Sequence, residues 1–387
     1  MKFDKRNYKH WFYLFSTVLC LLLALPFAIS LRRGKKTIIF YGHKFNGNLK
    51  SFFVYLLKRN ADDLSIYYLT MDKMYYQKLM NQIPVLYTGN FEHMIKVLRS
   101  HAIISDHGLQ ALSPIRLLKR IKLIDVWHGI PFKGFDPYDF KNIHCFDQVW
   151  VASRSLKRFY VEKFGFNEKR VRVTGYARID PLITKDYCEI DLLDKYGIKD
   201  NYRKIILMAP TWKHEDASRS VFPFDVSARE FITKLSELGK NRKSLIIFRT
   251  HLNTKLGEAI ALSNIRFIPF NEYPDTEEVL YISDILVTDW SSIAFDYLVL
   301  RKPTIFMDVK PPFAKGFTYD ATYRYGEVVD SFKSLIESIE KYIISPERFI
   351  DKYGRKMDEV FLEVYGDAAD GRSSERYYLN LMSLIAT

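Results

Sequence analysis

The chain has few cysteines and lacks paired acidic residues at its predicted strand ends. Its three cysteines, Cys20, Cys145 and Cys188, form no metal-binding or redox spacing. An odd, scattered set of this kind is typical of a reducing compartment and argues against a disulfide framework. No DxD-like acidic pair follows a predicted strand, so we expect no metal and no other cofactor. Internal repeats and low-complexity tracts are also absent, and a composition of 48% hydrophobic and 27% charged residues is ordinary for a folded protein.

Acidic residues are outnumbered by basic ones, and the basic excess is unevenly placed. The formal net charge is +13. Residues 1–36 carry much of it, because only Asp4 opposes the basic side chains there, which are Lys2, Lys5, Arg6, Lys9, Arg32, Arg33, Lys35 and Lys36. A basic excess beside one apolar segment suits an anionic membrane surface better than a nucleic-acid groove. We therefore expect a membrane partner and no nucleic acid.

The apolar segment WFYLFSTVLCLLLALPFAISL, residues 11–31, contains no charged residue. It is long enough to cross a bilayer as a helix. Ala28 and Ser30 would also fit a signal-peptide cleavage site, but the basic residues that follow favour a retained anchor. Pro26 and the two basic flanks also permit a helix that dips into one leaflet without crossing it. The sequence leaves these two modes of attachment open.

Short apolar runs alternate with helical patterns after residue 36. One series of runs lies at 36–42, 64–70, 101–106, 121–129, 148–153 and 169–175, with helical patterns at 49–59, 73–80 and 91–99. A second series lies at 204–212, 243–251, 265–270, 284–290 and 302–308. Apolar strands that alternate with helices predict parallel sheets covered on both faces. We therefore predict an α/β protein with a membrane segment at 1–36 and two doubly wound, Rossmann-like domains at 37–180 and 181–387, facing a central cleft.

Polar residues follow the predicted strands in both series. They are His128, Arg178, Pro210, Thr211, Arg249, His251, Ser291 and Ser292. Ligands of doubly wound sheets bind beyond the carboxyl ends of the strands. Each residue alone has a structural explanation, because a lone histidine is usually a satisfied structural residue and a lone arginine a surface charge. Together they suit group transfer at a phosphate, where arginines neutralise the anion and a histidine takes a proton.

The stretch TDWSSIAFDYLVLRKP, residues 288–303, places two serines at a predicted strand-to-helix turn. Ser291 or Ser292 could be an N-cap that satisfies free N–H groups of the helix. The same turn could instead hold a phosphate, because N–H groups and the helix dipole favour an anion there. The local sequence does not separate these two interpretations.

Seven motifs, in order over nearly the whole chain after the apolar segment, resemble the CDP-glycerol glycerophosphotransferases, the primases and polymerases of teichoic acids. WHGIPFK is similar to the family's WHGTPLK, TGYARID to GxPRxD, APTWK to APTWR, and RTHLN to RxHP. FYGHKFNGNLKSFFVYL resembles the family's opening strand and asparagine-containing loop, TDWSSIAFDYLVLRKPTIF resembles TDYSSxxFDF with its downstream KP, and DGRSSER a C-terminal signature. The resemblance implies a GT-B-type fold, and it favours the phosphate interpretation of the serine pair.

The resemblance also implies roles for individual residues. His128 would be the base that deprotonates the acceptor, and His251 would stabilise charge on the phosphate or protonate the CMP leaving group. Ser291 and Ser292 would contact the diphosphate, and Asp296 the glycerol hydroxyls or the ribose. The remaining substrate contacts would come from Gly129, Ile130, Pro131, Phe132, Arg178, Pro210, Thr211, Lys213, Arg249 and Thr250. The chain departs from the family pattern at Ile130, Lys213 and Leu252, and a lysine cannot fork onto two oxygens as an arginine does.

The expected function is that of a transferase. The substrate would be CDP-glycerol or a related CDP-polyol, and the acceptor a hydroxyl of a lipid-linked polyprenyl-diphosphate saccharide or polymer, with release of CMP. The reaction would take place at the cytoplasmic face of the cell membrane. Three alternatives stay open: a CDP-ribitol-dependent transferase, a GT-B glycosyltransferase that uses a nucleotide sugar, and an inactive membrane scaffold.

Overall fold

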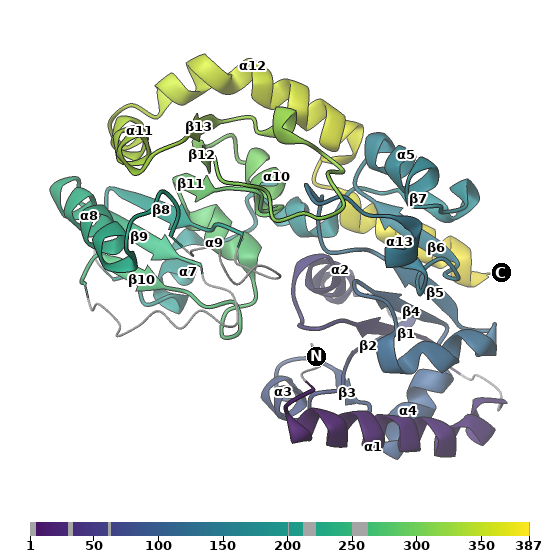
Figure 1. Ribbon diagram of the computed structural model, residues 1–387. Helices are drawn as coiled ribbons and strands as arrows, with labels where there is room; N and C mark the ends of the chain where they lie inside the picture. Colours follow the sequence, from purple (N-terminus) through teal and green to yellow (C-terminus); the bar gives the residue numbers. More distant parts are fainter. Residues whose placement is uncertain are drawn as a thin grey trace. The chain divides into compact units, whose positions relative to one another are not determined.

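The chain folds into two compact units (Figure 1). The computed structural model describes residues 5–29, 34–60, 63–199, 201–211, 222–249 and 262–386. Unit 1 consists of residues 1–128, 136–180 and 368–387. Unit 2 consists of residues 129–135 and 181–367. Each unit contains one parallel sheet, so the predicted α/β class and its two doubly wound domains are confirmed.

The sheet of unit 1 has seven parallel strands in the order β3-β2-β1-β4-β5-β6-β7. All four residues of β4 and of β6 are buried, because helices cover both faces of the sheet. The predicted runs of the first series all form strands, whereas the three-residue strand β3 was not predicted. The bounds are β1 Lys36–Tyr41, β2 Leu64–Thr70, β3 Val85–Tyr87, β4 Ala102–Ser105, β5 Lys122–Asp125, β6 Gln148–Val151 and β7 Val171–Val173.

Several helices of unit 1 begin at side-chain caps and bury apolar faces. The side chains of Asp72, Asn90 and Ser153 accept N–H groups at the starts of α3, α4 and α5. Phe52 on α2 packs against Trp150 and Tyr377 in the core of the unit. The bounds are α1 Tyr8–Ala24, η1 Leu25–Ile29, α2 Gly47–Lys58, α3 Lys73–Leu79, α4 Phe91–Leu98, η2 Gln110–Leu118, η3 Pro137–Phe140, α5 Arg154–Glu162, η4 Glu168–Arg170, η5 Ala177–Ile179 and α13 Ser373–Ala386.

The sheet of unit 2 repeats the same order with six parallel strands, β10-β9-β8-β11-β12-β13. Its core contains Leu207, Leu245, Ile247 and Leu286 from three neighbouring strands. The strands are β8 Lys204–Met208, β9 Ser244–Phe248, β10 Ile265–Phe267, β11 Ile285–Thr288, β12 Thr304–Met307 and β13 Glu327–Val329. The helices are α6 Asp180–Thr184 at the junction of the units, then α7 Glu189–Lys195, α8 Ala228–Asn241, α9 Thr276–Ile282, α10 Ile293–Leu298, η6 Ala321–Tyr323, α11 Phe332–Ile344, α12 Glu347–Val364 and η7 Gly366–Ala368.

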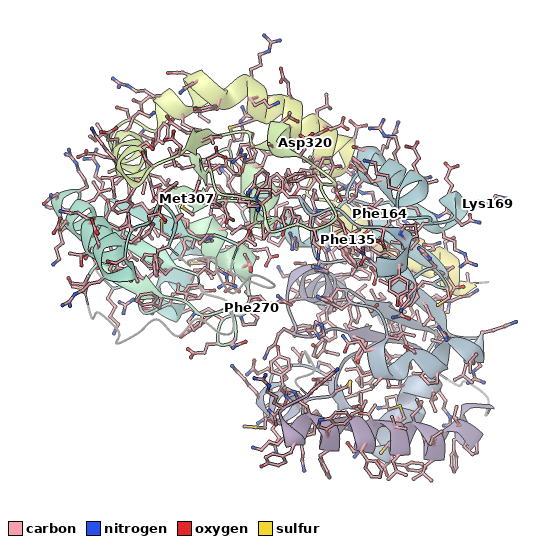
Figure 2. All side chains as sticks on the ribbon, viewed as in Figure 1. Phe135, Phe164, Lys169, Phe270, Met307 and Asp320 are labelled. Atoms are coloured by element: carbon pink, nitrogen blue, oxygen red, sulfur yellow. The ribbon has the colours of Figure 1, made fainter. Side chains whose placement is uncertain are left out.

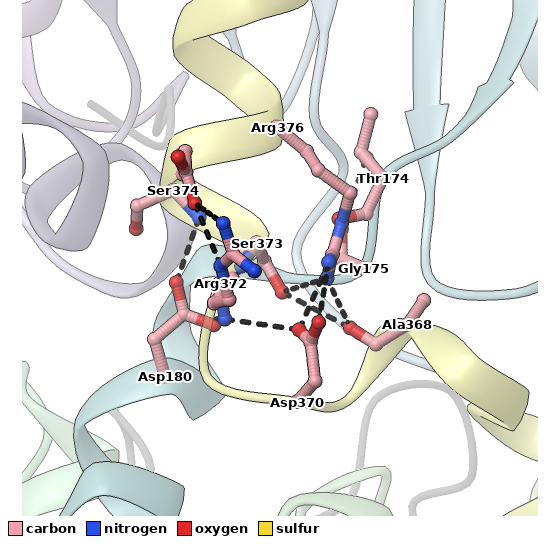
Figure 3. A network of polar contacts seen from close by, with 10 residues as sticks. Thr174, Gly175, Asp180, Ala368, Asp370, Arg372, Ser373, Ser374 and Arg376 are labelled. Carbon is pink, nitrogen blue, oxygen red and sulfur yellow. Dashed lines mark hydrogen bonds and ion pairs between the residues drawn. The ribbon is translucent and has the colours of Figure 1, made fainter.

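The C-terminal helix α13 belongs to unit 1, although the sequence placed all of 181–387 in one domain. Polar contacts made by the DGRSSER segment explain the difference (Figure 3). The buried carboxylate of Asp180 accepts the N–H groups of Ser373 and Ser374 at 3.0 and 2.7 Å. Arg376 donates to the carbonyl of Thr174 at 2.7 Å and to Asp370 at 2.9 Å. This C-terminal signature therefore fastens α13 to unit 1.

Candidate active site

Three histidines lie with two aspartates, Asp106 and Asp125, at the carboxyl edge of the sheet in unit 1. The strand order reverses between β1 and β4, which is where doubly wound sheets bind ligands. His43 follows β1, His107 follows β4, and His128 follows β5. The His107 ring lies 4.3 Å from the rings of both His43 and His128, and it stacks on His128 with an interplanar angle of 6°. The sequence predicted only His128, although His43 and His107 also directly follow predicted strands.

The acidic partner of His107 is its neighbour Asp106. His107 Nδ1 lies 2.8 Å from Asp106 Oδ1. Burial acts to lower the pKa of His107, but Asp106 outweighs it and the pKa is raised. Burial likewise acts to raise the pKa of Asp106, but His107, His128 and His43 outweigh it and the pKa is lowered. Both shifts favour an imidazolium–carboxylate pair.

The orientation of His128 leaves one ring nitrogen available. His128 Nδ1 lies 3.1 Å from the backbone carbonyl of Asp106. Because a carbonyl only accepts hydrogen bonds, Nδ1 must be the donor, and Nε2 of the neutral ring is then an acceptor. The pKa of His128 is lowered, first by desolvation among surrounding protein atoms and then by His107 and Arg178. The side chain is nevertheless exposed to solvent, so it is both neutral and reachable.

The backbone around His128 is held by a buried asparagine. Asn48 Nδ2 donates to the carbonyls of Val126 and Trp127 at 2.9 and 3.1 Å, and its Oδ1 accepts the N–H of Arg178 at 3.1 Å. The guanidinium of Arg178 in turn donates to the His128 carbonyl at 2.7 Å. Trp127 has a φ of 47°, a left-handed conformation that a bulky residue adopts only when its surroundings enforce it. The hydrogen bonds from Asn48 to the Trp127 carbonyl and from Arg178 to the His128 carbonyl hold this conformation.

The loop after His128 leaves unit 1 and packs in unit 2. Ile130 and Phe132 are 0% and 1% exposed. The Phe132 ring stacks on Phe295 at 4.4 Å, and the Phe132 carbonyl accepts the N–H of Thr318. These two side chains pack within unit 2, and the substrate contacts predicted for them stay predictions. Gly129 and Pro131 of the same loop are also buried.

The sheet of unit 2 presents a second group of polar residues at its own switch point, between β8 and β11. Asp289 Oδ1 accepts the N–H groups of Thr211 and Trp290, at 2.6 and 2.5 Å, and thereby joins the ends of the two strands. Thr211 Oγ1 is buried and has no hydrogen-bond partner among the described residues. A buried hydroxyl of this kind is costly unless a ligand or water completes it. Pro210, beside it, is partly exposed.

Arg249, predicted to line the donor site, is only 6% exposed. Its Nη2 donates to the Tyr273 carbonyl and to Thr276 Oγ1, both at 3.0 Å. Burial lowers its pKa, while Glu277 and other acidic neighbours favour the charged form. Arg249 therefore lies at the end of β9, and acidic neighbours in unit 2 partly offset its charge.

The serine pair begins the short helix α10. Ser292 occupies the N-cap position, yet its side chain makes no capping hydrogen bond. Ser291 and Ser292 are both partly exposed, as a ligand contact requires. Asp296 is 1% exposed, and its Oδ1 lies 3.4 Å from the Tyr365 hydroxyl. Its predicted contact with the glycerol hydroxyls or the ribose stays a prediction.

Three further predicted residues lie outside the described part of the chain. They are Lys213, Thr250 and His251. Their predicted roles on the donor and leaving group stay predictions.

Two doubly wound parallel sheets, each with polar residues at its switch point, define a protein of the GT-B type. A family model described as CDP-Glycerol:Poly(glycerophosphate) glycerophosphotransferase matches residues 25–383. The chain belongs to this family, as its motifs indicated.

Relatives of the chain act in teichoic acid synthesis. The chain is 28% identical over 286 residues to the teichoic acid ribitol-phosphate polymerase TarL of Staphylococcus aureus, covering 69% of this chain and 49% of that protein. It is 24% identical over 318 residues to the teichoic acid glycerol-phosphate primase of Bacillus subtilis, covering 76% of each. A solved structure of the wall teichoic acid polymerase TagF superposes with a TM-score of 0.77 at 16% identity, covering 96% of this chain and 94% of that one. The chain spans about half the length of several polymerases that it matches.

Proposed function

We propose that this protein transfers a phosphopolyol, above all glycerol phosphate, from its CDP-activated donor to a hydroxyl group of a lipid-linked acceptor. The observation that carries the proposal is the state of His128. It is a neutral, exposed imidazole with Nδ1 engaged and Nε2 left as an acceptor, at the ligand-binding edge of the sheet. Family membership supplies the donor class.

The proposed reaction is a substitution at phosphorus. The acceptor oxygen attacks the phosphorus that bears the polyol, and His128 Nε2 takes the hydroxyl proton. A new P–O bond forms while the bond from that phosphorus to the bridging oxygen of the diphosphate breaks, so that CMP leaves. Arg178 and Asn48 hold the His128 backbone in place, which counts because misplacing a base by about 1 Å can cost 100-fold in rate. His251 remains the predicted group for charge on the phosphate or the leaving group.

The donor-side residues of the proposal come from unit 2. The buried Thr211 hydroxyl has no hydrogen-bond partner among the described residues, and a phosphate or ribose oxygen would complete it. The partly exposed Ser291 and Ser292 stand at the end of β11 and supply hydroxyl and N–H groups for the diphosphate. Positive side chains and helix N-termini would neutralise the phosphates without an acidic metal site.

Ribitol phosphate is the second candidate for the transferred group. Among the curated relatives, TarL and TarK of Staphylococcus aureus are ribitol-phosphate polymerases, at 28% and 26% identity. Relatives that act with glycerol phosphate reach 28% identity as well, over a shorter stretch of 220 residues. The two polyols are therefore to be separated by experiment.

The proposed location is the cytoplasmic face of the cell membrane. The CDP-polyol donor is a cytosolic molecule, and a lipid-linked acceptor presents its growing end at the bilayer surface. One helix of the described chain, Tyr8–Phe27, is long and apolar enough to cross a membrane, which is weak evidence for attachment.

The test is a donor panel. Purified protein is incubated with a lipid-linked saccharide acceptor and, in turn, CDP-glycerol, CDP-ribitol and a set of nucleotide sugars, and nucleotide release and acceptor mass are measured. CDP-glycerol should give acceptor-dependent CMP release, and His128→Ala should reduce it by about 100-fold or more. The matched control is His144→Ala, because His144 precedes β6 and its Nε2 contacts the Phe164 carbonyl at 2.9 Å.

Other outcomes would contradict the proposal. Release of a nucleoside diphosphate from a nucleotide sugar would make the protein a glycosyltransferase. Absence of nucleotide release from every donor would favour the scaffold alternative. A folded His128→Ala variant with near-normal turnover would refute the role of His128.

A further inference from the structure

Three loops at the carboxyl edge of unit 1 bring their histidines into one cluster. Strands β1, β4 and β5 are neighbours in the sheet (Figure 1), so the loops that follow them meet at the same edge. The His107 ring contacts both others: it lies parallel to His128 at 4.3 Å and 6°, and it is tilted by 53° from His43 at the same separation. Imidazoles this close influence each other's protonation, because a charge on one ring opposes a charge on the next.

The carboxylate of Asp106 makes His107 the member of this cluster that holds a proton most firmly. His107 Nδ1 lies 2.8 Å from Asp106 Oδ1, and Asp106 is only 5% exposed. A buried carboxylate favours a cation at this distance, because its own charge would otherwise stay uncompensated. Burial acts to lower the pKa of His107, but Asp106 and then Asp125, at the end of β5, raise it, and the net shift is upward. His107 therefore stays charged to a higher pH than a free imidazole does.

His128 is constrained twice by this pair. Its Nδ1 donates to the Asp106 backbone carbonyl at 3.1 Å, which leaves Nε2 as the acceptor. Its ring also lies against the charged ring of His107. A second positive charge at about 4 Å is disfavoured by roughly one to three pKa units, between the dielectric constants of water and of a protein surface. Desolvation and then His107 lower the pKa of His128, Asp106 raises it by less than His107 lowers it, and Arg178 lowers it again.

We propose that His107 is a positioning residue for the transfer: as an imidazolium paired with Asp106, it keeps the stacked His128 ring neutral and oriented, with Nε2 ready to accept a proton. This inference rests on the proposed function, in which His128 is the base. Once the proton of the acceptor hydroxyl has moved to His128 Nε2, two cations lie face to face. The proton is then released to water, which reaches the exposed His128 side chain, and the neutral base is restored.

Nuclear magnetic resonance of the histidine rings tests the proposal without any substrate. The full chain, with its nine histidines labelled with ¹³C, is titrated between about pH 4 and 8, and His128→Ala and His107→Arg assign the two signals. In the wild type, His107 should titrate above the ordinary histidine value of about 6.5 while His128 stays neutral. His107→Phe keeps a flat ring without charge and should raise the His128 midpoint by about one pKa unit or more. His107→Arg keeps a flat cation beside Asp106 and should leave His128 neutral.

The control is His144→Phe, which removes a histidine elsewhere in unit 1. His144 precedes β6, and its Nε2 lies 2.9 Å from the carbonyl of Phe164, which follows α5 and is labelled in Figure 2. This variant should leave the His128 midpoint unchanged. Equal His128 midpoints in the wild type, His107→Phe and His107→Arg would overturn the proposal. Thermal melting checks folding, and if His107→Phe does not fold, the wild type still decides: a His107 that loses its proton at lower pH than His128 would also overturn it.

The pH profile of transfer separates this inference from the proposed function. The acid limb of kcat/KM follows protonation of the free base. His107→Phe should move that limb upward by about one pH unit or more, and His107→Arg should restore the wild-type profile. A raised His128 midpoint without CMP release from any donor would uphold the action of His107 on His128 and refute the proposed function. An unchanged midpoint and an unchanged limb in an active His107→Phe enzyme would refute the inference alone.

Discussion

Replacement of Asn48 by alanine should damage both stability and turnover, because one side chain holds two loops. Asn48 is 2% exposed and makes three hydrogen bonds, to the carbonyls of Val126 and Trp127 and from the N–H of Arg178. At about 1 kcal/mol for each buried hydrogen bond, Asn48→Ala should cost about 3 kcal/mol of unfolding free energy. The free energy of unfolding of a typical domain is roughly 5–15 kcal/mol, so this loss is a large share of it.

The loss in turnover follows from the same contacts. Without Asn48, the left-handed Trp127 loses a hydrogen bond at its carbonyl, and His128 loses part of its backbone support. We expect kcat to fall by about 10- to 100-fold, as a base shifted by a fraction of an ångström to 1 Å would. Asn48→Asp should be equally harmful, because its carboxylate can accept the Arg178 N–H but cannot donate to the two carbonyls.

A buried asparagine in unit 2 provides the control. Asn264 is 4% exposed and exchanges two hydrogen bonds with Ser236, at 2.7 and 2.9 Å. Asn264→Ala should cost about 2 kcal/mol by the same reckoning and leave kcat of the folded enzyme unchanged. Urea unfolding and CMP release at saturating donor are the assays. An Asn48→Ala variant with normal kcat, or one that loses no more stability than an exposed substitution, would refute the holding role of Asn48.

Two further predictions concern the serine pair and the buried carboxyl group of Asp125. Ser291→Ala with Ser292→Ala should weaken CDP-glycerol binding in calorimetry but cost less than about 1 kcal/mol of stability, because Ser292 makes no capping hydrogen bond; unchanged affinity with a large stability loss would restore the cap interpretation. Burial raises the pKa of Asp125 to about 7, so between about pH 4 and 7 the folded state keeps a proton that the unfolded chain has lost. Stability should therefore fall as pH rises, by roughly 1.4 kcal/mol per unit. Asp125→Asn should flatten that slope in urea titrations, and an identical slope would contradict the burial argument.

Most strands of the two sheets could be predicted, because buried parallel strands appear in the sequence as continuous apolar runs. The eleven predicted runs became strands, whereas the short strands β3 and β13, each at one end of its sheet, were missed. The return of α13 to unit 1 was also missed. It depends on a carboxylate, Asp180, that accepts N–H groups nearly two hundred residues away in sequence, and no local pattern reports such a contact.

The candidate site was predictable in part. Position after a strand was sufficient to place His128 and Thr211 at the carboxyl edges of their sheets, because parallel strands bring their carboxyl ends to one edge. The same signal was available for His107 but was not used. Burial could not be predicted for Phe132 and Asp296, because a motif can preserve residues that pack as well as residues that react.

The attachment of unit 1 bears on how the proposed reaction would select its acceptor. Unit 1 carries both α1 and His128. If α1 attaches the protein to the membrane, the base is tied to the bilayer through one compact unit, and the acceptor that it deprotonates must arrive along the membrane surface. The proposed donor residues Thr211, Ser291 and Ser292 belong to unit 2, which has no such helix among its described residues. Membrane attachment would therefore act on the acceptor side of the reaction, while exchange of the soluble CDP-polyol and CMP stays open to the cytosol.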